Sequence, residues 1–161
     1  MTERTSPARQ PGTAAGPNLD EFLCFAVYST GLAFNRVYKP LLDPLGLTYP
    51  QYLAMVALWQ EDNQMVSQLG EKLFLESNTL TPLIKRLEAA GFVTRRRDTK
   101  DERVVRVSLT PAGRALAEAA ACLPEQVLKA TGITPAQLET MRTTLTALRT
   151  NLRSADTTTD I

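Results

Sequence analysis

The residues best suited to chemistry in this sequence are two thiols, Cys24 and Cys122. Histidine is absent, which removes Ser-His-Asp and Cys-His catalysis and the usual zinc sites. The first residues carry no signal-peptide pattern and no apolar run is long enough for a membrane span, so we expect a cytoplasmic protein. In that reducing compartment a thiol is more often structural or redox-active than part of a permanent disulfide. We expect no metal and no cofactor.

A second group of functional side chains is basic. Between Lys85 and Arg106 the chain has eight basic and four acidic residues, a net charge of +4, whereas the whole chain carries only +1. Such a run is often no more than a solvated surface, but it also suits the phosphates of DNA. The elements around the run favour the second interpretation, a surface for DNA.

Two short helices and a hairpin surround the basic run. Apolar residues recur at helical spacing over Val66–Leu73 and again over Leu80–Leu87, with a short turn between them and Gly91 as the cap of the second helix. The periodicity then changes to two, so Phe92–Arg97 and Val104–Leu109 predict two strands joined by a polar turn. This is the order of a winged helix-turn-helix, in which the basic hairpin is a DNA-binding wing.

The second of these helices, about Ser77 to Ala90, is the predicted reader of the major groove. Small polar side chains near its N-terminus can reach base edges, and basic ones behind them can hold phosphates. Its predicted DNA-contacting residues are Ser77, Asn78, Thr79, Thr81, Lys85 and Arg86. Those of the hairpin are Arg95, Arg97, Lys100, Asp101 and Arg103. We expect Asp101 to orient Arg103 for a narrow minor groove, and Pro82 to fall near the end of the first helical turn, where its missing N–H is tolerated.

Helices flank this reader on both sides. On the N-terminal side, Asn18 is a plausible cap for a helix over Leu19–Val37, and Thr48 begins another that runs to about Gln60. The first is apolar nearly all round. In a small protein such a helix is most readily buried against another subunit.

On the C-terminal side, Thr110 opens a helix that Pro124 interrupts, and Thr134 caps a last helix. The last helix has apolar residues at coiled-coil spacing, namely Leu138, Met141, Leu145, Leu148 and Leu152. This stripe could pack on the chain's own core. With helices at both ends and the reader in the middle, we predict instead a homodimer whose interface is built from both termini.

These elements predict a mostly helical fold with a small β-hairpin wing, in one domain over residues 18–153. The DNA-binding lobe covers about 48–110, and the dimerisation helices cover about 18–45 and 111–153. Residues 1–17 and 154–161 have the composition of disordered tails. Two readers related by a dimer axis fit major grooves roughly 34–36 Å apart, so we expect a pseudo-palindromic operator in double-stranded DNA.

Three stretches of this reader, Leu80–Glu88, Gly91–Val93 and Asp101–Arg103, closely resemble the MarR family of bacterial regulators. The resemblance covers about residues 19–152. It implies a winged-helix fold, a homodimer and DNA as the partner.

Three further stretches, Leu23–Tyr28, Tyr38–Leu42 and Leu47–Tyr52, are similar to the organic-hydroperoxide-sensing OhrR group of that family. This resemblance implies that organic hydroperoxides oxidise Cys24 and that the repressor then leaves DNA.

The same resemblance implies that Tyr28, Tyr38 and Tyr49 surround Cys24, and that Cys122 is the resolving cysteine of an intersubunit disulfide. Tyr28 is four residues from Cys24 on the same helix face, whereas Tyr38 is about 21 Å along the axis and could reach only Cys24 of the partner subunit. Phenol O–H groups that donate to sulfur favour the thiolate, which attacks peroxide. Without the motifs, both cysteines would be interpreted as small packing residues.

Three functions are therefore in competition. The first is a repressor released when hydroperoxide oxidises Cys24, and the second is a MarR-type regulator released by a bound phenolic or lipophilic ligand. The third is a thiol peroxidase, an enzyme in which the basic wing has no role. We expect the first and do not expect an enzyme.

Overall fold

The computed structural model describes residues 18–156, which divide between Arg36 and Val37 into two compact units. The division falls inside helix α1 (Leu23–Leu42), and the two units are described separately. Residues 1–17 and 157–161 of the expected tails lie outside the described residues. One domain over residues 18–153 stays a prediction.

The first unit begins with a short 3-10 helix and not with the α-helix expected from residue 19. Asn18 accepts a hydrogen bond from the backbone N–H two residues later and so caps η1 (Leu19–Glu21). Phe22 is extended, with φ −83° and ψ 117°, and separates η1 from α1. The expected start was wrong by one turn, and as a result Cys24 lies in the first turn of α1.

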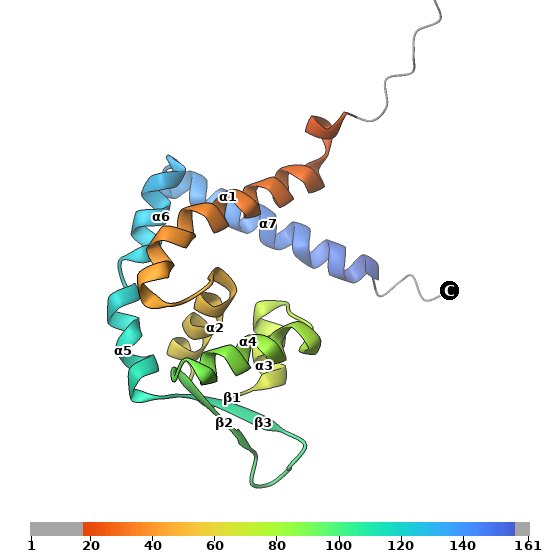
Figure 1. The fold of residues 1–161 in the computed structure, drawn as a ribbon. Coiled ribbons are helices and arrows are strands. Elements are labelled where there is room, and N and C mark those ends of the chain that lie inside the picture. The colour runs from red at the N-terminus through yellow and green to blue at the C-terminus, as the bar shows by residue number, and fades with distance from the viewer. Residues whose placement is uncertain (1–17, 157–161) are drawn as a thin grey trace, which may run out of the picture. The chain divides into compact units, whose positions relative to one another are not determined.

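The second unit has its core between three helices and a small sheet. Helices α2 (Tyr49–Gln60), α3 (Val66–Leu73) and α4 (Ser77–Ala89) pack against the sheet (Figure 1). The N–H of Thr48 donates to Gln51 Oε1 over 2.8 Å, which confirms the predicted start of α2. The largest fully buried apolar side chains are Leu42, Met55, Leu58, Leu69, Leu80, Ile84, Leu87, Val93 and Val107.

The helix-turn-helix follows the prediction closely. Phe74 has a left-handed backbone, φ 56°, and closes α3 three residues before α4 begins. Gly91, with φ 81°, lets the N–H of Phe92 bond to the carbonyl of Leu87, which confirms the predicted cap of α4. Pro82 lies in the second turn of α4 and not in the first, so α4 lacks one internal hydrogen bond there.

The wing is a three-stranded antiparallel sheet with the order β1-β3-β2. The predicted hairpin is confirmed as β2 (Val93–Arg97) and β3 (Val105–Leu109). Strand β1 (Gln64–Met65) pairs with the other side of β3. Two residues are too few for a periodic pattern, so the sequence analysis missed β1.

The C-terminal part contains helices α5 (Pro111–Ala120), α6 (Leu123–Thr131) and α7 (Pro135–Asp156). Pro124 lies in the first turn of α6 and so begins a new helix, where its missing N–H costs nothing. The N–H of Thr134 donates to Gln137 Oε1 over 2.8 Å, and the N–H of Gln137 donates to Thr134 Oγ1 over 3.3 Å. This pair of bonds confirms the predicted capping box. Because α7 extends to Asp156, residues 154–156 are helical and were wrongly assigned to the C-terminal tail.

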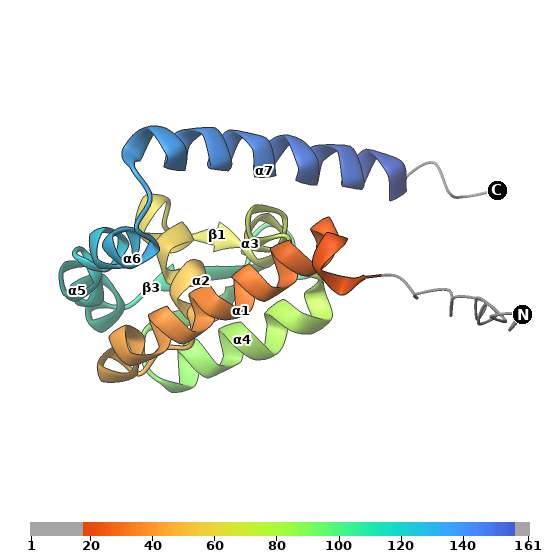
Figure 2. The same ribbon diagram turned by 90° about the horizontal axis from the view of Figure 1, so that it is seen from above.

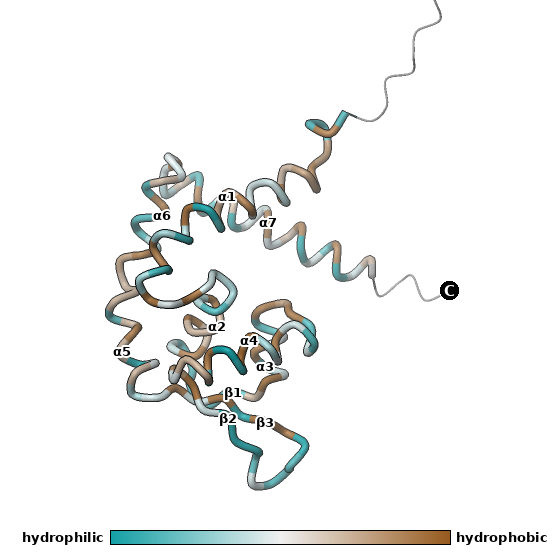
Figure 3. The backbone as a smooth tube through the Cα atoms, in the orientation of Figure 1, coloured by the Kyte–Doolittle hydropathy of each residue, from teal (hydrophilic) through white to brown (hydrophobic). Residues whose placement is uncertain are grey.

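Helix α7 is one long helix with little cover from its own unit (Figure 2). Hydrophobic and hydrophilic residues alternate along it, whereas the tip of the wing is hydrophilic (Figure 3). It contacts the helix-turn-helix through Phe74, whose ring lies 4.1 Å from the guanidinium of Arg149 and 5.1 Å from that of Arg153. Within residues 18–156, no helix combines the length and the apolar character needed to cross a membrane.

Candidate functional site

Helix α4 exposes the side that the sequence predicts to face DNA. Its buried residues are Leu80, Leu83, Ile84 and Leu87. The predicted contact residues on the opposite side are exposed, except Thr81, which is half-buried. The helix therefore presents hydroxyl, amide and basic groups on one accessible face.

The basic residues of the hairpin divide into two kinds. Arg97, Lys100 and Arg103 are exposed. Arg95 is half-buried, and its Nε donates to Glu88 Oε2 over 2.7 Å while its backbone N–H donates to Oε1 over 3.0 Å. These bonds lower the pKa of Glu88 below its ordinary value. Arg95 therefore ties the hairpin to α4, and its charge is neutralised by Glu88.

Asp101 bonds to Arg103 as expected, but to its backbone and not to its side chain. Its Oδ1 accepts the backbone N–H of Arg103 over 3.0 Å, so it shapes the turn of the wing and forms no ion pair with that guanidinium. A second internal ion pair joins Arg106 to Asp98. Because the two internal pairs remove equal charge of each sign, the net +4 between Lys85 and Arg106 remains on the exposed residues.

A hollow of about 320 Å³ connects α4 with the hairpin. Its polar lining comprises Ser67, Ser77, Thr81, Arg95 and Arg103. The rest of the lining is apolar and consists of Met65, Val66, Ile84, Val104 and Val105, so the reader helix and the wing line one hollow of mixed character. Ser67 was missed because its exposure on α3 gives no periodic signal.

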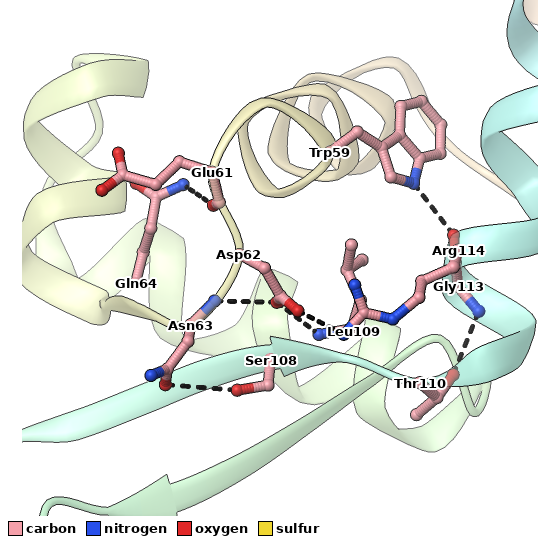
Figure 4. Close-up of polar contacts among 10 residues, drawn as sticks. All are labelled: Trp59, Glu61, Asp62, Asn63, Gln64, Ser108, Leu109, Thr110, Gly113 and Arg114. Atoms are coloured by element: carbon pink, nitrogen blue, oxygen red, sulfur yellow. Dashed lines mark hydrogen bonds and ion pairs between the residues drawn. The ribbon is translucent and has the colours of Figure 1, made fainter.

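Three other residues that the sequence analysis did not single out support the base of the wing. They are Asp62, Asn63 and Arg114, which bond to one another and to β3 (Figure 4). An Asp-Asn pair at the end of a helix is an ordinary turn signal. Its long-range partners cannot be identified from the sequence.

In the first unit, Cys24 and Tyr28 lie one turn apart on α1, and both are exposed. Tyr28 is 63% exposed. The first intrahelical bond of α1 runs from the N–H of Ala26 to the carbonyl of Phe22, so Cys24 lies among the N–H groups that have no partner within the helix. Its sulfur is a free thiol at the start of a helix.

In the second unit, the fold gathers three tyrosines. The ring of Tyr38 lies 4.5 Å from that of Tyr49 and 5.7 Å from that of Tyr52, which in turn lies 6.1 Å from Trp59. Burial, followed by the two neighbouring phenols, raises the pKa of Tyr38 to about 12. Burial also raises the pKa of Tyr49 and of Tyr52. All three groups are therefore protonated hydrogen-bond donors at neutral pH.

Cys122 lies between α5 and α6 and is exposed. Its sulfur accepts a hydrogen bond from Gln126 Nε2 over 3.2 Å. A charge on the Cys122 sulfur is the smallest of the three contributions to the raised pKa of Tyr52, after burial and Tyr49, so the two side chains are within range of a Coulombic interaction. The second unit thus brings together Tyr38, Tyr49 and Cys122, while Cys24 and Tyr28 belong to the first.

Within residues 18–156, no group of three or more Cys, Asp or Glu side chains is arranged to hold a metal ion.

Known proteins are similar to this chain in sequence and in fold. The family model for the transcriptional regulator SarA/Rot matches residues 36–120. The HTH-type transcriptional regulator TtmR of Methylorubrum extorquens is 45% identical over 94% of this chain and 77% of its own length. The organic hydroperoxide resistance transcriptional regulator of Bacillus subtilis is 46% identical over 68% of this chain and 75% of its own length.

Among solved structures, reduced AbfR bound to DNA superimposes with a TM-score of 0.72 at 32% identity, over 83% of this chain and 91% of that chain. AbfR has also been solved overoxidised on DNA, with a TM-score of 0.69, and with a disulfide formed, with a TM-score of 0.59. The fold is a MarR-type winged helix-turn-helix with a three-stranded wing. The chain therefore belongs to the MarR/SarA family of DNA-binding transcriptional regulators, which are not enzymes.

Proposed function

We propose that this regulator is a homodimeric repressor that leaves its operator after an organic hydroperoxide oxidises Cys24. The relative in Bacillus subtilis is named for organic hydroperoxide resistance, and AbfR is known in reduced, overoxidised and disulfide forms. The observation that carries the proposal is the cluster of Tyr38, Tyr49 and Tyr52. Phenols from two helices meet there as hydrogen-bond donors, and Cys122 is within Coulombic range of Tyr52.

The position of Cys24 suits a peroxide-reactive thiol. Anions are stabilised near helix N-termini by the helix dipole and by unpaired N–H groups, and Cys24 lies in the first turn of α1. Neighbouring Leu23 and Val27 are exposed apolar side chains. An apolar hydroperoxide tail gains by burial against such groups, so organic hydroperoxides should react faster than hydrogen peroxide.

The proposed chemistry is a two-electron oxidation. The Cys24 thiolate attacks the terminal oxygen of the hydroperoxide, an S–O bond forms as the O–O bond breaks, and the alkoxide takes a proton and leaves as an alcohol. The resulting sulfenic acid condenses with the Cys122 thiol of the other subunit, which forms a disulfide and releases water. Tyr38 and Tyr49 donate hydrogen bonds to Cys24 of the partner subunit and stabilise its thiolate.

Release from DNA would follow from the disulfide. Overoxidised AbfR was solved bound to DNA, so overoxidation is compatible with DNA binding in that relative. A disulfide requires the two Cα atoms to approach within roughly 7 Å, and this pull would rotate the two readers away from successive major grooves. The readers are α4 and the wing of each subunit, with the contact residues predicted from the sequence except Arg95, which is paired with Glu88.

The test is operator binding before and after a stoichiometric dose of cumene hydroperoxide. The wild type should dissociate, whereas Cys24→Ser should bind like the reduced protein and stay bound. Release of Cys24→Ser at the wild-type dose would falsify the sensor assignment. Cys122→Ser should form no covalent dimer on non-reducing electrophoresis and should stay on DNA, whereas a small-thiol adduct on Cys24 of the wild type would contradict a resolving role for Cys122.

The same experiment separates the proposal from its alternative. A regulator released by a bound phenolic or lipophilic ligand would respond to that ligand equally with and without Cys24. Tyr38→Phe and Tyr49→Phe should slow oxidation without changing the affinity for DNA, because each removes a hydroxyl and keeps the packed ring.

A further inference from the structure

The carboxylate of Asp62 joins three elements of the fold. Its Oδ1 accepts the N–H of Leu109 over 2.8 Å and that of Asn63 over 2.7 Å. Its Oδ2 accepts Nη2 of Arg114 over 2.5 Å (Figure 4). Asp62 lies just after α2, Leu109 ends β3, and Arg114 is in the first turn of α5. One side chain thus ties together a core helix, the central strand of the wing and the helix that follows it.

Asp62 is charged in this position. Partial burial acts to raise its pKa, but the hydrogen bonds from Leu109, Asn63 and Arg114 outweigh burial and lower the pKa below its ordinary value. At neutral pH the carboxylate therefore accepts all three bonds as an anion, and hydrogen bonds to an anion are stronger than neutral ones.

The network continues from Asn63 to the turn of the wing. The carbonyl of Asn63 accepts Arg106 Nη1 over 3.0 Å, and its Oδ1 accepts the hydroxyl of Ser108 over 3.3 Å. Arg106 forms its ion pair with Asp98, which also accepts the N–H of Lys100 over 2.8 Å. A continuous path of polar bonds therefore runs from α5 through Asp62 to the turn that carries Arg103.

The hairpin needs such support. An isolated two-stranded hairpin is marginally stable in water, and β1 adds only two residues of pairing to β3. The wing also carries exposed like charges on Arg96, Arg97 and Arg103, which repel one another. A wing that reads DNA must hold these charges at a fixed distance from α4.

We infer that Asp62 is a positioning residue for DNA binding, which sets the angle at which the hairpin leaves the core and so places Arg103 relative to α4. This inference rests on the proposal that the wing contacts DNA. Asp62 acts through the backbone of Leu109 and through Arg114, at the end of β3 opposite the turn.

The test compares Asp62→Asn with Arg103→Ala in the full chain. Asparagine keeps an acceptor for the backbone but presents its NH₂ group to Arg114. Operator affinity should fall roughly fivefold to tenfold in either variant. Protection of the minor groove by the wing should be lost, while protection of the major groove by α4 remains. The double variant should bind no worse than either single one, because both act through the same contact.

Glu61→Gln is the matched control, because Glu61 is the residue before Asp62. The substitution removes an exposed ion pair with Lys72 and should leave the affinity for the operator unchanged. Independent losses that multiply in the double variant, or wild-type affinity of Asp62→Asn, would overturn the inference. Equal loss of minor- and major-groove protection would also overturn it, since that is the effect of general destabilisation.

If Arg103→Ala binds like the wild type, the proposal that the wing contacts DNA fails instead. The inference about Asp62 is then judged on the free protein, from residual dipolar couplings of the amides in β2 and β3 relative to those in α4. A changed hairpin orientation in Asp62→Asn supports the positioning role, and an unchanged one overturns it.

Discussion

The helix-turn-helix and α7 have apolar residues at the same helical spacing, but these side chains are buried in the first region and exposed in the second. In α3 and α4, Leu69, Leu80 and Leu87 are at most 1% exposed, because α2 and the sheet cover them. In α7, Leu145 is 44% and Leu152 is 63% exposed. The first region is a core that this chain completes by itself. The second is an apolar face that needs another surface, which we propose to be a second copy of the chain.

The largest expected effect on stability is at Gly113, a buried glycine of α5. A Cβ added to Gly113 would lie 2.0 Å from the carbonyl oxygen of Phe92, and the carbonyl of Gly113 also accepts the indole N–H of Trp59 over 2.9 Å. We expect Gly113→Ala to lower the free energy of unfolding by about 3 kcal/mol or more, because backbone must move.

Gly31→Ala is the counterpart in α1, where a Cβ meets nothing within 4 Å. It should leave stability unchanged or raise it by up to about 1 kcal/mol through helix propensity. Urea denaturation measures both. A clear loss in Gly31→Ala would show that the dimer covers this face of α1 closely.

The face of α7 can be tested by adding a charge. Leu145→Glu should raise the dissociation constant of the dimer more than about 100-fold, because an unpaired buried charge costs on the order of 3 kcal/mol or more. Thr146→Glu changes an exposed neighbour outside the apolar stripe and should have little effect. Sedimentation equilibrium gives both constants. Unchanged association of Leu145→Glu would remove α7 from the proposed interface.

Two arginines of the hairpin sharpen the comparison within the DNA-binding surface. Exposed Arg103→Ala should weaken operator binding roughly fivefold to tenfold and make the salt dependence shallower by about one ion. Arg95→Ala should act mainly on stability, since Arg95 is already paired with Glu88. Titrations of the operator at several salt concentrations distinguish them. A shallower salt dependence in Arg95→Ala would mean that DNA breaks its pair with Glu88.

The smallest expected effect is on the pH dependence of stability. The pKa of Asp62 is lowered in the folded state, so the unfolded chain binds more protons between the two pKa values. The contribution of Asp62 is therefore complete above the ordinary carboxyl pKa of about 4 and is lost as the pH falls through the lowered value. Asp62→Asn should flatten this acid limb of the unfolding curve.

Glu139→Gln is the comparison on α7. The hydrogen bond from Arg142 lowers the pKa of Glu139, but this pair is solvent-exposed and should change the limb less than Asp62 does. If both variants changed the acid limb equally, solvent would screen the hydrogen bonds of Asp62 as strongly as those of a surface ion pair.

Features that depend on neighbours in the chain were predictable from the sequence. The bounds of α3 and α4, the cap at Gly91, the two strands of the hairpin and the capping box at Thr134 all follow from periodicity and turn chemistry. The exposed face of α4 followed too, because it is the side opposite the leucines. The extended Phe22 was an exception, since a continuing apolar pattern concealed the break that brings Cys24 to the start of α1.

Features that depend on residues distant in the chain required the folded structure. The sequence identified Tyr38, Tyr49 and Cys122 only through a family resemblance, and packing is what gathers the phenols around Tyr52. The partners of Asp62 lie 47 and 52 residues away at Leu109 and Arg114. Periodicity records which face of an element is apolar, whereas a hydrogen bond across such a separation exists only once burial has brought two elements together.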